Sequence, residues 1–246
     1  MENLTFDADP EEVVKLLESP YYRGFVCADV ERFTHEHVAE VVQAMIISHE
    51  YVRDHPESYA KPIVRIHFFD CSMDEEDFLY FVSQLPKTRI RDLKMAEMRT
   101  IQESVIQRLI EVLPLLKLYA FEFSTDGVHP EMREADVYVA ALQAKTTCLR
   151  MLDMHTEAAV RKVLYAMQTT EHRVTYLEFC CSEMPMTSSF FEDFIEFVRN
   201  NPQITRYKLY KLHYNELQTD VLTKTMEVCK KQFRMIENWY DEPDDD

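Results

Sequence analysis

The sequence predicts an α/β fold in which short strands and helices alternate along one parallel sheet. Two observations support this prediction: a strand-like apolar motif that recurs along the chain, and helix-like segments between its copies. The chain has only two glycines, Gly24 and Gly127. Average usage would be roughly 7% glycine. The sequence has neither a G-x-x-x-x-G-K-[ST] nor a G-x-G-x-x-G segment, which excludes nucleotide binding through those phosphate loops.

The recurring motif has the form apolar-x-x-apolar-x-apolar, which is typical of short strands with a buried face. From the second copy onward, its middle residues are separated by 27, 28, 31, 25, 30 and 29 residues. The first interval is 41 residues, which predicts an insertion around Tyr51 to Pro62. The eight middle residues, which predict the strand centres, are Phe25, Ile66, Leu93, Phe121, Leu152, Leu177, Tyr207 and Ile236.

Helix-like segments lie between these copies. Residues 72–75, 100–103 and 189–192 each have the Ser/Thr-x-x-Glu pattern of a capping box before an apolar periodic run. Three prolines, Pro86, Pro114 and Pro202, are expected to stop the helices that precede them. Further helices are expected over residues 10–18, 133–144, 156–167 and 215–231, the first of them as an N-terminal cap.

Alternation of strand and helix about every 28 residues resembles the ribonuclease-inhibitor-like leucine-rich repeats. The resemblance covers residues 22–240 and implies a solenoid of about seven or eight repeats, with a curved parallel sheet on the concave face and helices on the convex face. It implies one domain, 1–246, with a cap at 1–21 and an acidic tail at 241–246. Of the ninth repeat positions, which are Asn or Cys in this family, only Cys71 conforms, so irregular repeats are expected.

The formal charge of −17 indicates an acidic surface. Such a field repels nucleic acid and anionic membranes, and it either favours a basic protein partner or simply keeps the chain soluble. The sequence has no signal-peptide pattern and no apolar run of the roughly 20 residues that span a membrane. Its six cysteines include no C-x-x-C pair, so they are expected to be reduced thiols of an intracellular, cytoplasmic or nuclear protein, with Cys27 and Cys71 inside.

Strand alternation predicts which side chains reach the concave face. Three acids, Glu122, Asp153 and Glu178, share the fifth repeat position and are expected side by side. Adjacent like charges are unfavourable unless a cation lies over them. The sequence therefore predicts a non-catalytic protein-binding scaffold that takes a basic segment of its partner, although solvated carboxylates helped by Lys94 and Lys208 are the alternative. The other residues expected at this binding surface are Met151, Tyr176, His155, Tyr210 and Trp239.

Other functions stay open from the sequence alone. Ser124, His155 and Cys180 share the seventh repeat position, which suggests a Ser-His or Cys-His dyad. A smooth sheet offers such a dyad neither pocket nor oxyanion hole, so neither catalysis nor a cofactor is expected. The acidity also resembles that of acidic nuclear leucine-rich proteins, which implies histone- or chaperone-like binding.

Two further features bear on metals and self-association. His35 and His37, two residues apart on an expected helix, are not spaced like zinc ligands, so no metal is expected. Residues 233–240 end the expected sheet and are a candidate for edge-to-edge pairing with another chain.

Overall fold

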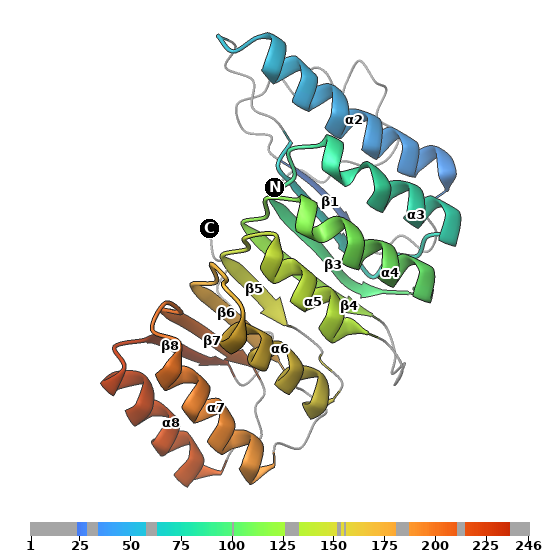
Figure 1. Ribbon diagram of the computed structural model, residues 1–246. Helices are drawn as coiled ribbons and strands as arrows, with labels where there is room; N and C mark the ends of the chain where they lie inside the picture. The colour runs from blue at the N-terminus through green and yellow to red at the C-terminus, as the bar shows by residue number, and fades with distance from the viewer. Residues whose placement is uncertain are drawn as a thin grey trace.

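A computed structural model of the chain contains one eight-stranded sheet with the strand order β1 to β8. The structure describes residues 24–28, 34–57, 63–99, 101–125, 133–151, 154, 156–180, 187–210 and 215–236. Each strand pairs in parallel with the next one along the chain, so the strands lie in chain order (Figure 1). This arrangement confirms the predicted parallel sheet.

The strands are four to seven residues long and alternate with longer helices. The strands are β1 (Gly24–Ala28), β2 (Arg65–Phe69), β3 (Asp92–Met98), β4 (Ala120–Thr125), β5 (Cys148–Met151), β6 (Tyr176–Cys180), β7 (Arg206–Tyr210) and β8 (Gln232–Ile236). The helices are α2 (His35–Asp54), α3 (Glu75–Gln84), α4 (Glu103–Val112), α5 (Glu134–Gln143), α6 (Glu157–Thr169), α7 (Ser188–Asn200) and α8 (Glu216–Val228).

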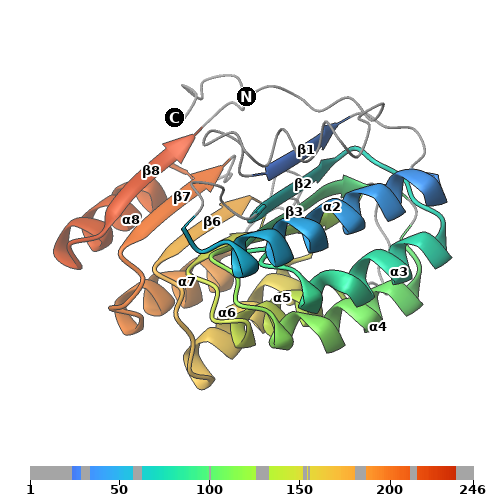
Figure 2. The same ribbon diagram turned by 90° about the horizontal axis from the view of Figure 1, so that it is seen from above.

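The described helices all cover the same face of the sheet, as Figure 2 shows from above. Each of them connects two neighbouring parallel strands, which is the connection that parallel pairing requires. In the 41-residue first interval, α2 has 20 residues where α3 and α4 have 10 each, which accounts for much of the extra length. The predicted insertion therefore begins earlier than Tyr51, while residues 58–62 lie outside the described part, as does the expected cap at 10–18.

The core lies between the sheet and the helices. Every second strand residue faces it, because successive side chains of a strand point to opposite faces. One core row, with exposed fractions of at most 2%, runs across six strands, β2 to β7, in register. Its fully described members are Ile66, Leu93, Phe121, Leu149, Leu177 and Tyr207. Phe68, Met95, Phe123, Met151, Phe179 and Leu209 form the second core row and are equally buried.

The predicted register is wrong in two repeats. Leu149, and not Leu152, pairs with Phe121 and Leu177, and the described part of β5 ends before Leu152. Phe233, and not Ile236, pairs with Tyr207. Each segment has an apolar-x-apolar pair three residues before the expected one, Leu149 with Met151 and Phe233 with Met235, but the first motif position of that frame is polar, Thr146 and Lys230. The observed frame makes the intervals from Leu93 through Phe121 and Leu149 to Leu177 a uniform 28 residues.

The expected helices that fall on described residues are confirmed, but the predicted capping boxes are not. The helix α3 starts after Asp74 and α4 after Gln102, neither of which forms a side-chain cap, and α7 is capped by Thr187. A capping box does form at α8, between Asn215 and Gln218. Ser72, which was predicted to cap α3, instead forms an isolated β-bridge with Arg99 that prolongs the β2–β3 pairing.

Two lysines take the left-handed backbone conformation that glycine commonly takes after a helix. Lys145 and Lys230, which follow α5 and α8, have φ values of 62° and 55°, at positions where helices commonly place glycine.

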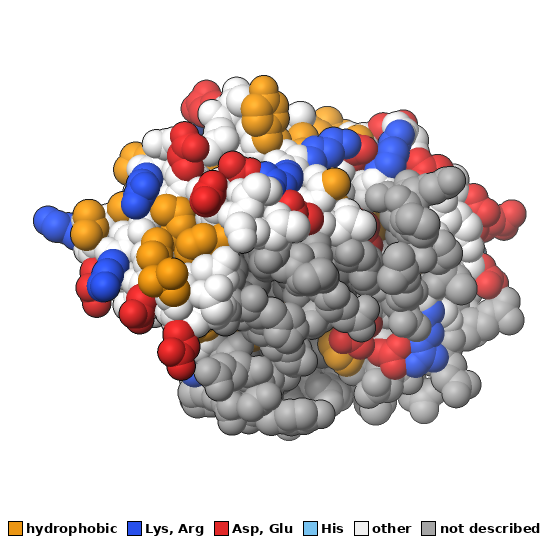
Figure 3. Space-filling view, turned by 90° about the horizontal axis from the view of Figure 1, so that it is seen from below, with side chains coloured by type: hydrophobic (Ala, Val, Ile, Leu, Met, Phe, Trp, Pro, Cys, Tyr) orange, Lys and Arg blue, Asp and Glu red, His pale blue; other side chains and the backbone are white. Residues whose placement is uncertain are grey.

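The outer side of α8 carries exposed apolar residues, Leu217, Val221 and Val228. Figure 3 shows hydrophobic side chains gathered at this left-hand end of the molecule. Among the described helices, none follows α8.

Candidate functional site

The strand residues that alternate with the core rows lie on the sheet face opposite the helices. Two rows of them run in register from β2 to β8, and we call them the outer row and the charged row. The outer row is Arg65, Asp92, Ala120, Cys148, Tyr176, Arg206 and Gln232. The charged row is His67, Lys94, Glu122, Arg150, Glu178, Lys208 and Arg234.

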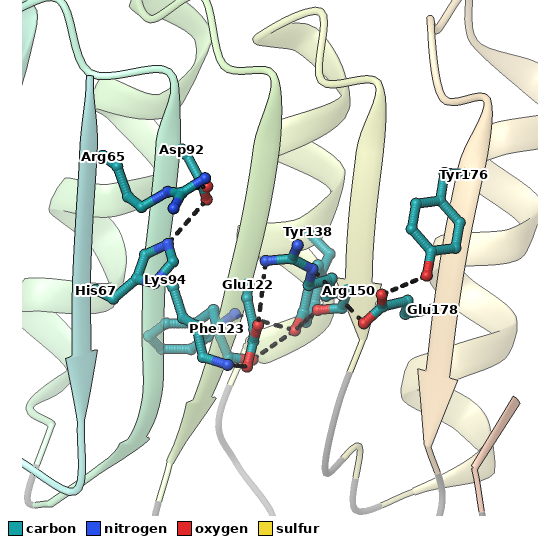
Figure 4. A network of polar contacts seen from close by, with 10 residues as sticks. All are labelled: Arg65, His67, Asp92, Lys94, Glu122, Phe123, Tyr138, Arg150, Tyr176 and Glu178. Atoms are coloured by element: carbon teal, nitrogen blue, oxygen red, sulfur yellow. Dashed lines mark hydrogen bonds and ion pairs between the residues drawn. The ribbon is translucent and has the colours of Figure 1, made fainter. Parts of the chain in front are cut away.

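Asp92 joins the two rows at β2 and β3. Its carboxylate accepts a hydrogen bond from Arg65 Nε at 3.0 Å and lies 3.2 Å from His67 Nε2 (Figure 4). Burial works to raise the pKa of Asp92, but the neighbouring His67, Arg150 and Arg65 outweigh it and hold that pKa below its ordinary value. Asp92 is therefore ionised in the folded protein at neutral pH.

Glu122 is the most buried member of the charged row, with 1% of its surface exposed. Its Oε1 lies 3.0 Å from Lys94 Nζ, and its Oε2 lies 3.8 Å from Arg150 Nη1. That Oε2 atom is buried and accepts no hydrogen bond from the described residues. Burial raises the pKa of Glu122 above its ordinary value, against the opposing effects of Lys94 and Arg150. Lys94 and Arg150 thus compensate part of the charge of a carboxylate whose burial favours its protonated form.

Arg150 lies between two carboxylates. Besides its contact with Glu122, its Nε is 3.5 Å from Glu178 Oε2. The Tyr176 hydroxyl donates a hydrogen bond of 2.6 Å to the other oxygen of Glu178. Burial, followed by this bond to Glu178, raises the pKa of Tyr176, so its hydroxyl stays protonated as a donor. From β3 to β6 the charged row is therefore an alternating ladder of base, acid, base and acid.

Tyr138 of α5 fixes the strands beneath this ladder. Its hydroxyl contacts the carbonyl oxygens of Phe123 at 2.5 Å and Arg150 at 2.8 Å, and it accepts from the Phe123 amide (Figure 4). The β4–β5 pairing ends at Glu122 and Arg150. The hydroxyl therefore joins the two strands where their ladder stops, and it holds Arg150 in line with both acids.

The structure changes the predicted acidic surface. Glu122 and Glu178 lie in one row, but Arg150 occupies the place between them that was predicted for Asp153. Met151 was expected on the concave face and is instead fully buried in the core, since the three-residue register shift turns it towards the helices. The contiguous strip of three acids is therefore not formed by the described residues. Asp153, His155 and Trp239 lie outside the described part.

The two remaining predicted residues differ in exposure. Tyr176 is partly exposed and belongs to the outer row, beside Glu178. Tyr210 was expected at the surface but is 2% exposed, and Lys208 Nζ lies 5.2 Å from its ring centroid. Arg150 is the residue that sequence reasoning missed. The signal that could have found it is the pair of intervals of 31 and 25 residues, which the observed register replaces with two of 28.

The suggested dyad has no support from the described geometry. Ser124 is 1% exposed and its Oγ accepts a hydrogen bond from the Glu97 amide at 2.9 Å. Cys180 is fully buried, and His155 lies outside the described residues. The thiol of Cys148 is also buried, which raises its pKa to about 12 and keeps it protonated at neutral pH. A protonated, enclosed thiol is a poor nucleophile.

A groove of about 860 Å³ lies between α6 and α7. Its side chains are engaged with one another: Arg161 forms ion pairs with Glu157 and Asp193 and lies 5.2 Å from the centroid of the Phe190 ring. At its end His172 accepts a hydrogen bond from the Val174 amide, and burial lowers the pKa of this histidine. The groove is therefore polar and internally paired.

Cys71 and the cysteines near the sheet behave as small apolar residues. Cys71 is fully buried, as predicted, and its thiol lies 3.1 Å from the Phe69 carbonyl oxygen. Cys148 and Cys229 carry free thiols.

Within the described ranges, no group of three or more His, Cys, Asp or Glu side chains could hold a metal ion. Among the helices that the structure describes, none has the length and apolar character to cross a membrane.

Comparison with known proteins adds no family to these observations. The chain matches no protein-family model, and a search of curated proteins finds no significant match. The functional argument therefore rests on the two rows and on the sheet that carries them.

Proposed function

We propose that this chain is a leucine-rich-repeat-like solenoid that acts as a non-catalytic, intracellular protein-binding scaffold. The observation that carries this proposal is the arrangement of eight parallel strands in chain order with the described helices on one face. Repeats of this kind bury their apolar faces by stacking on their neighbours. The opposite sheet face then remains as a broad surface for a partner.

Curvature of the sheet is part of the proposal. Packed helices lie roughly 8–10 Å apart, whereas neighbouring strands lie about 4.8 Å apart. A structure that repeats one strand and one helix per unit must therefore bend, with its strands on the inner side. A partner on the sheet face would be surrounded by the curve, which increases the area that one partner can bury.

The sheet face combines charged and apolar side chains of the kind found in protein interfaces. Arg65 offers a guanidinium with 44% of its side chain exposed, and Phe69 is an aromatic residue with 38% exposure. The charges of the alternating ladder compensate one another through ion pairs within the chain. A basic partner was predicted from three stacked acids, and the ladder removes that reason, so the charge of the partner has to follow from the exposed groups.

Site-specific photo-crosslinking tests this proposal. Benzoylphenylalanine would replace Phe69 on the sheet face in one variant and Tyr165 on α6 in the other. Both are exposed aromatic residues, with exposures of 38% and 67%, so the two substitutions are matched. In cells we expect the same protein to be captured repeatedly from position 69 and not from position 165. Capture only from position 165, or none from position 69, refutes binding on the sheet face.

A further inference from the structure

A column of basic residues follows the edge of the sheet at which helices lead into strands. Arg89, Lys117, Lys145 and Arg173 succeed one another at intervals of 28 residues. Each stands four residues before its strand's member of the core row that contains Phe121. All four residues are exposed. They therefore occupy one equivalent position in four neighbouring repeats, and we call them the basic column.

The backbone keeps these four positions in line. Two residues after each column position, the amide of Tyr119 donates to the carbonyl oxygen of Arg91 at 2.5 Å, that of Thr147 to Tyr119 at 3.0 Å, and that of Thr175 to Thr147 at 2.9 Å. Packed helices lie roughly 8–10 Å apart and neighbouring strands about 4.8 Å apart. A position between helix and strand therefore recurs at an interval of roughly 5–10 Å.

The column is basic in a chain with a net charge of −17. The four connections that contain it have six Lys or Arg residues and one acid, Glu171. On the sheet face, Arg65, Lys94 and Arg150 each form an ion pair with a carboxylate. Within the described ranges, no column residue forms such a pair. The connections are residues 85–91, 113–119, 144–147 and 170–175.

Folding gives little reason for these charges. A helix dipole favours cations only within about the last turn. Arg89 and Lys117 lie two residues beyond the 3-10 turns that follow α3 and α4, and Arg173 lies four residues beyond α6. Lys145 has a φ of 62°, which is unfavourable for a residue with a Cβ atom. Like charges on neighbouring repeats also repel. A binding role accounts for the column better than stability does.

We propose that the basic column binds an extended acidic peptide segment of a partner protein. In an extended peptide every second side chain points to the same side, at intervals of about 6.5 Å. This interval lies within the spacing of the column, so alternate carboxylates of the segment meet successive cations. The column lies at the edge where the strands begin and not on the sheet face. The inference therefore goes beyond the proposed scaffold function by adding a second binding surface.

Apolar side chains beside the column indicate what else the segment contains. Leu115 and Tyr119, two residues before and after Lys117, are 68% and 57% exposed. Aromatic and apolar side chains among cations are typical of the anchor points of protein interfaces. The segment is therefore expected to carry an apolar residue among its acids.

An acidic peptide fits the column better than a nucleic acid does. Proteins that bind single strands stack successive bases on several aromatic side chains. Tyr119 is the one Phe, Tyr or Trp in the four connections. The field of a chain with a net charge of −17 also repels a long polyanion, whereas a short acidic segment stays within the local positive field.

The test uses the full chain and a short, fluorescently labelled polyglutamate peptide, followed by fluorescence anisotropy. A polyglutamine peptide of the same length is the uncharged control and should not bind. Replacing Lys117→Gln together with Lys145→Gln should weaken polyglutamate binding about tenfold, the effect of losing two exposed ion pairs. The matched variant, Lys162→Gln with Lys224→Gln, removes the same charge from exposed positions on α6 and α8 and should bind like wild type.

A single substitution separates binding from folding. Lys145→Gly puts the residue that favours a positive φ at this position, so the variant should be at least as stable as wild type. It should nevertheless bind polyglutamate about threefold more weakly, because one cation is lost. Urea denaturation followed by circular dichroism measures its stability.

Several outcomes overturn the proposal. They are absence of polyglutamate binding, equal loss in both double variants, equal binding of polyglutamine, and wild-type affinity of Lys145→Gly. Tighter binding of a single-stranded oligonucleotide, lost with Lys117 and Lys145, assigns the column to nucleic acid instead. Binding that appears only after the chain's own acids at 241–246 are replaced assigns it to that segment. Capture of a partner from position 69 tests the sheet face independently, so the two proposals fail separately.

Discussion

Arg150 is the residue whose removal should most disturb the sheet face. It lies 3.5 Å from Glu178 and 3.8 Å from Glu122, and these two carboxylates are 6% and 1% exposed. The substitution Arg150→Met keeps most of the aliphatic stem and deletes the charge. It leaves Glu122 with Lys94 alone and Glu178 with the Tyr176 hydroxyl alone. Two buried acids are then under-compensated.

The expected cost follows from this geometry. Removing one member of a buried ion pair typically costs about 3–5 kcal/mol. Arg150 is 26% exposed, its contacts are long, and both acids keep one partner, so we expect a loss of about 2 kcal/mol at neutral pH. The double variant Arg150→Met with Glu178→Gln should recover part of it, because the second acid is then neutral. Urea denaturation followed by circular dichroism measures all three free energies of unfolding.

The pH dependence supplies an independent check. Burial raises the pKa of Glu122 above its unfolded value, so this acid destabilises the fold only where it is ionised. Loss of Arg150 raises that pKa further. The penalty of Arg150→Met should therefore be full at neutral pH and shrink as the pH falls through the folded pKa towards the unfolded one. A variant with the urea midpoint of wild type at neutral pH would refute the view that Arg150 neutralises these acids.

Three further substitutions test the rest of the structure. Asp92→Asn should destabilise at neutral pH, with the difference lost as the pH falls through the lowered pKa of Asp92; urea midpoints across pH measure it. Ionised Asp92 stabilises the fold, whereas ionised Glu122 destabilises it. Tyr138→Phe leaves two strand carbonyls without their hydroxyl contact and should cost roughly 1–3 kcal/mol in urea denaturation; an unchanged midpoint contradicts this role. Lys231→Met removes an ammonium that donates to three carbonyl oxygens after α7, at 2.6–3.0 Å, and should lower the melting temperature; Lys230→Met, at a more exposed position without those bonds, is the control.

Most of the strand and helix positions could be predicted because each repeat must bury one apolar face. Around Ile66, Leu93 and Phe121 a single frame satisfies the apolar spacing, and the predicted middle residues are the observed core residues. The helix ends were less predictable. A Ser-x-x-Glu pattern looks the same whether its serine caps a helix or, like Ser72, bridges to a neighbouring strand.

The charged site was less predictable than the fold because charge depends on register. Residues 149–154 read Leu-Arg-Met-Leu-Asp-Met, so the last two apolar positions of the motif fit either Leu149 and Met151 or Leu152 and Met154. A shift of three residues leaves an apolar row intact but puts Arg150 where Asp153 was expected. The error leaves the core rows apolar, but it replaces an expected acid with a base in the charged row. The uniform spacing of the neighbouring repeats was the information that could decide between the frames.

The charged row also explains why one frame is selected. With Arg150 between Glu122 and Glu178, each acid on these strands faces a cation, whereas the other frame would set three acids side by side. The core rows would be apolar in both frames, so the sheet face contributes the difference in free energy.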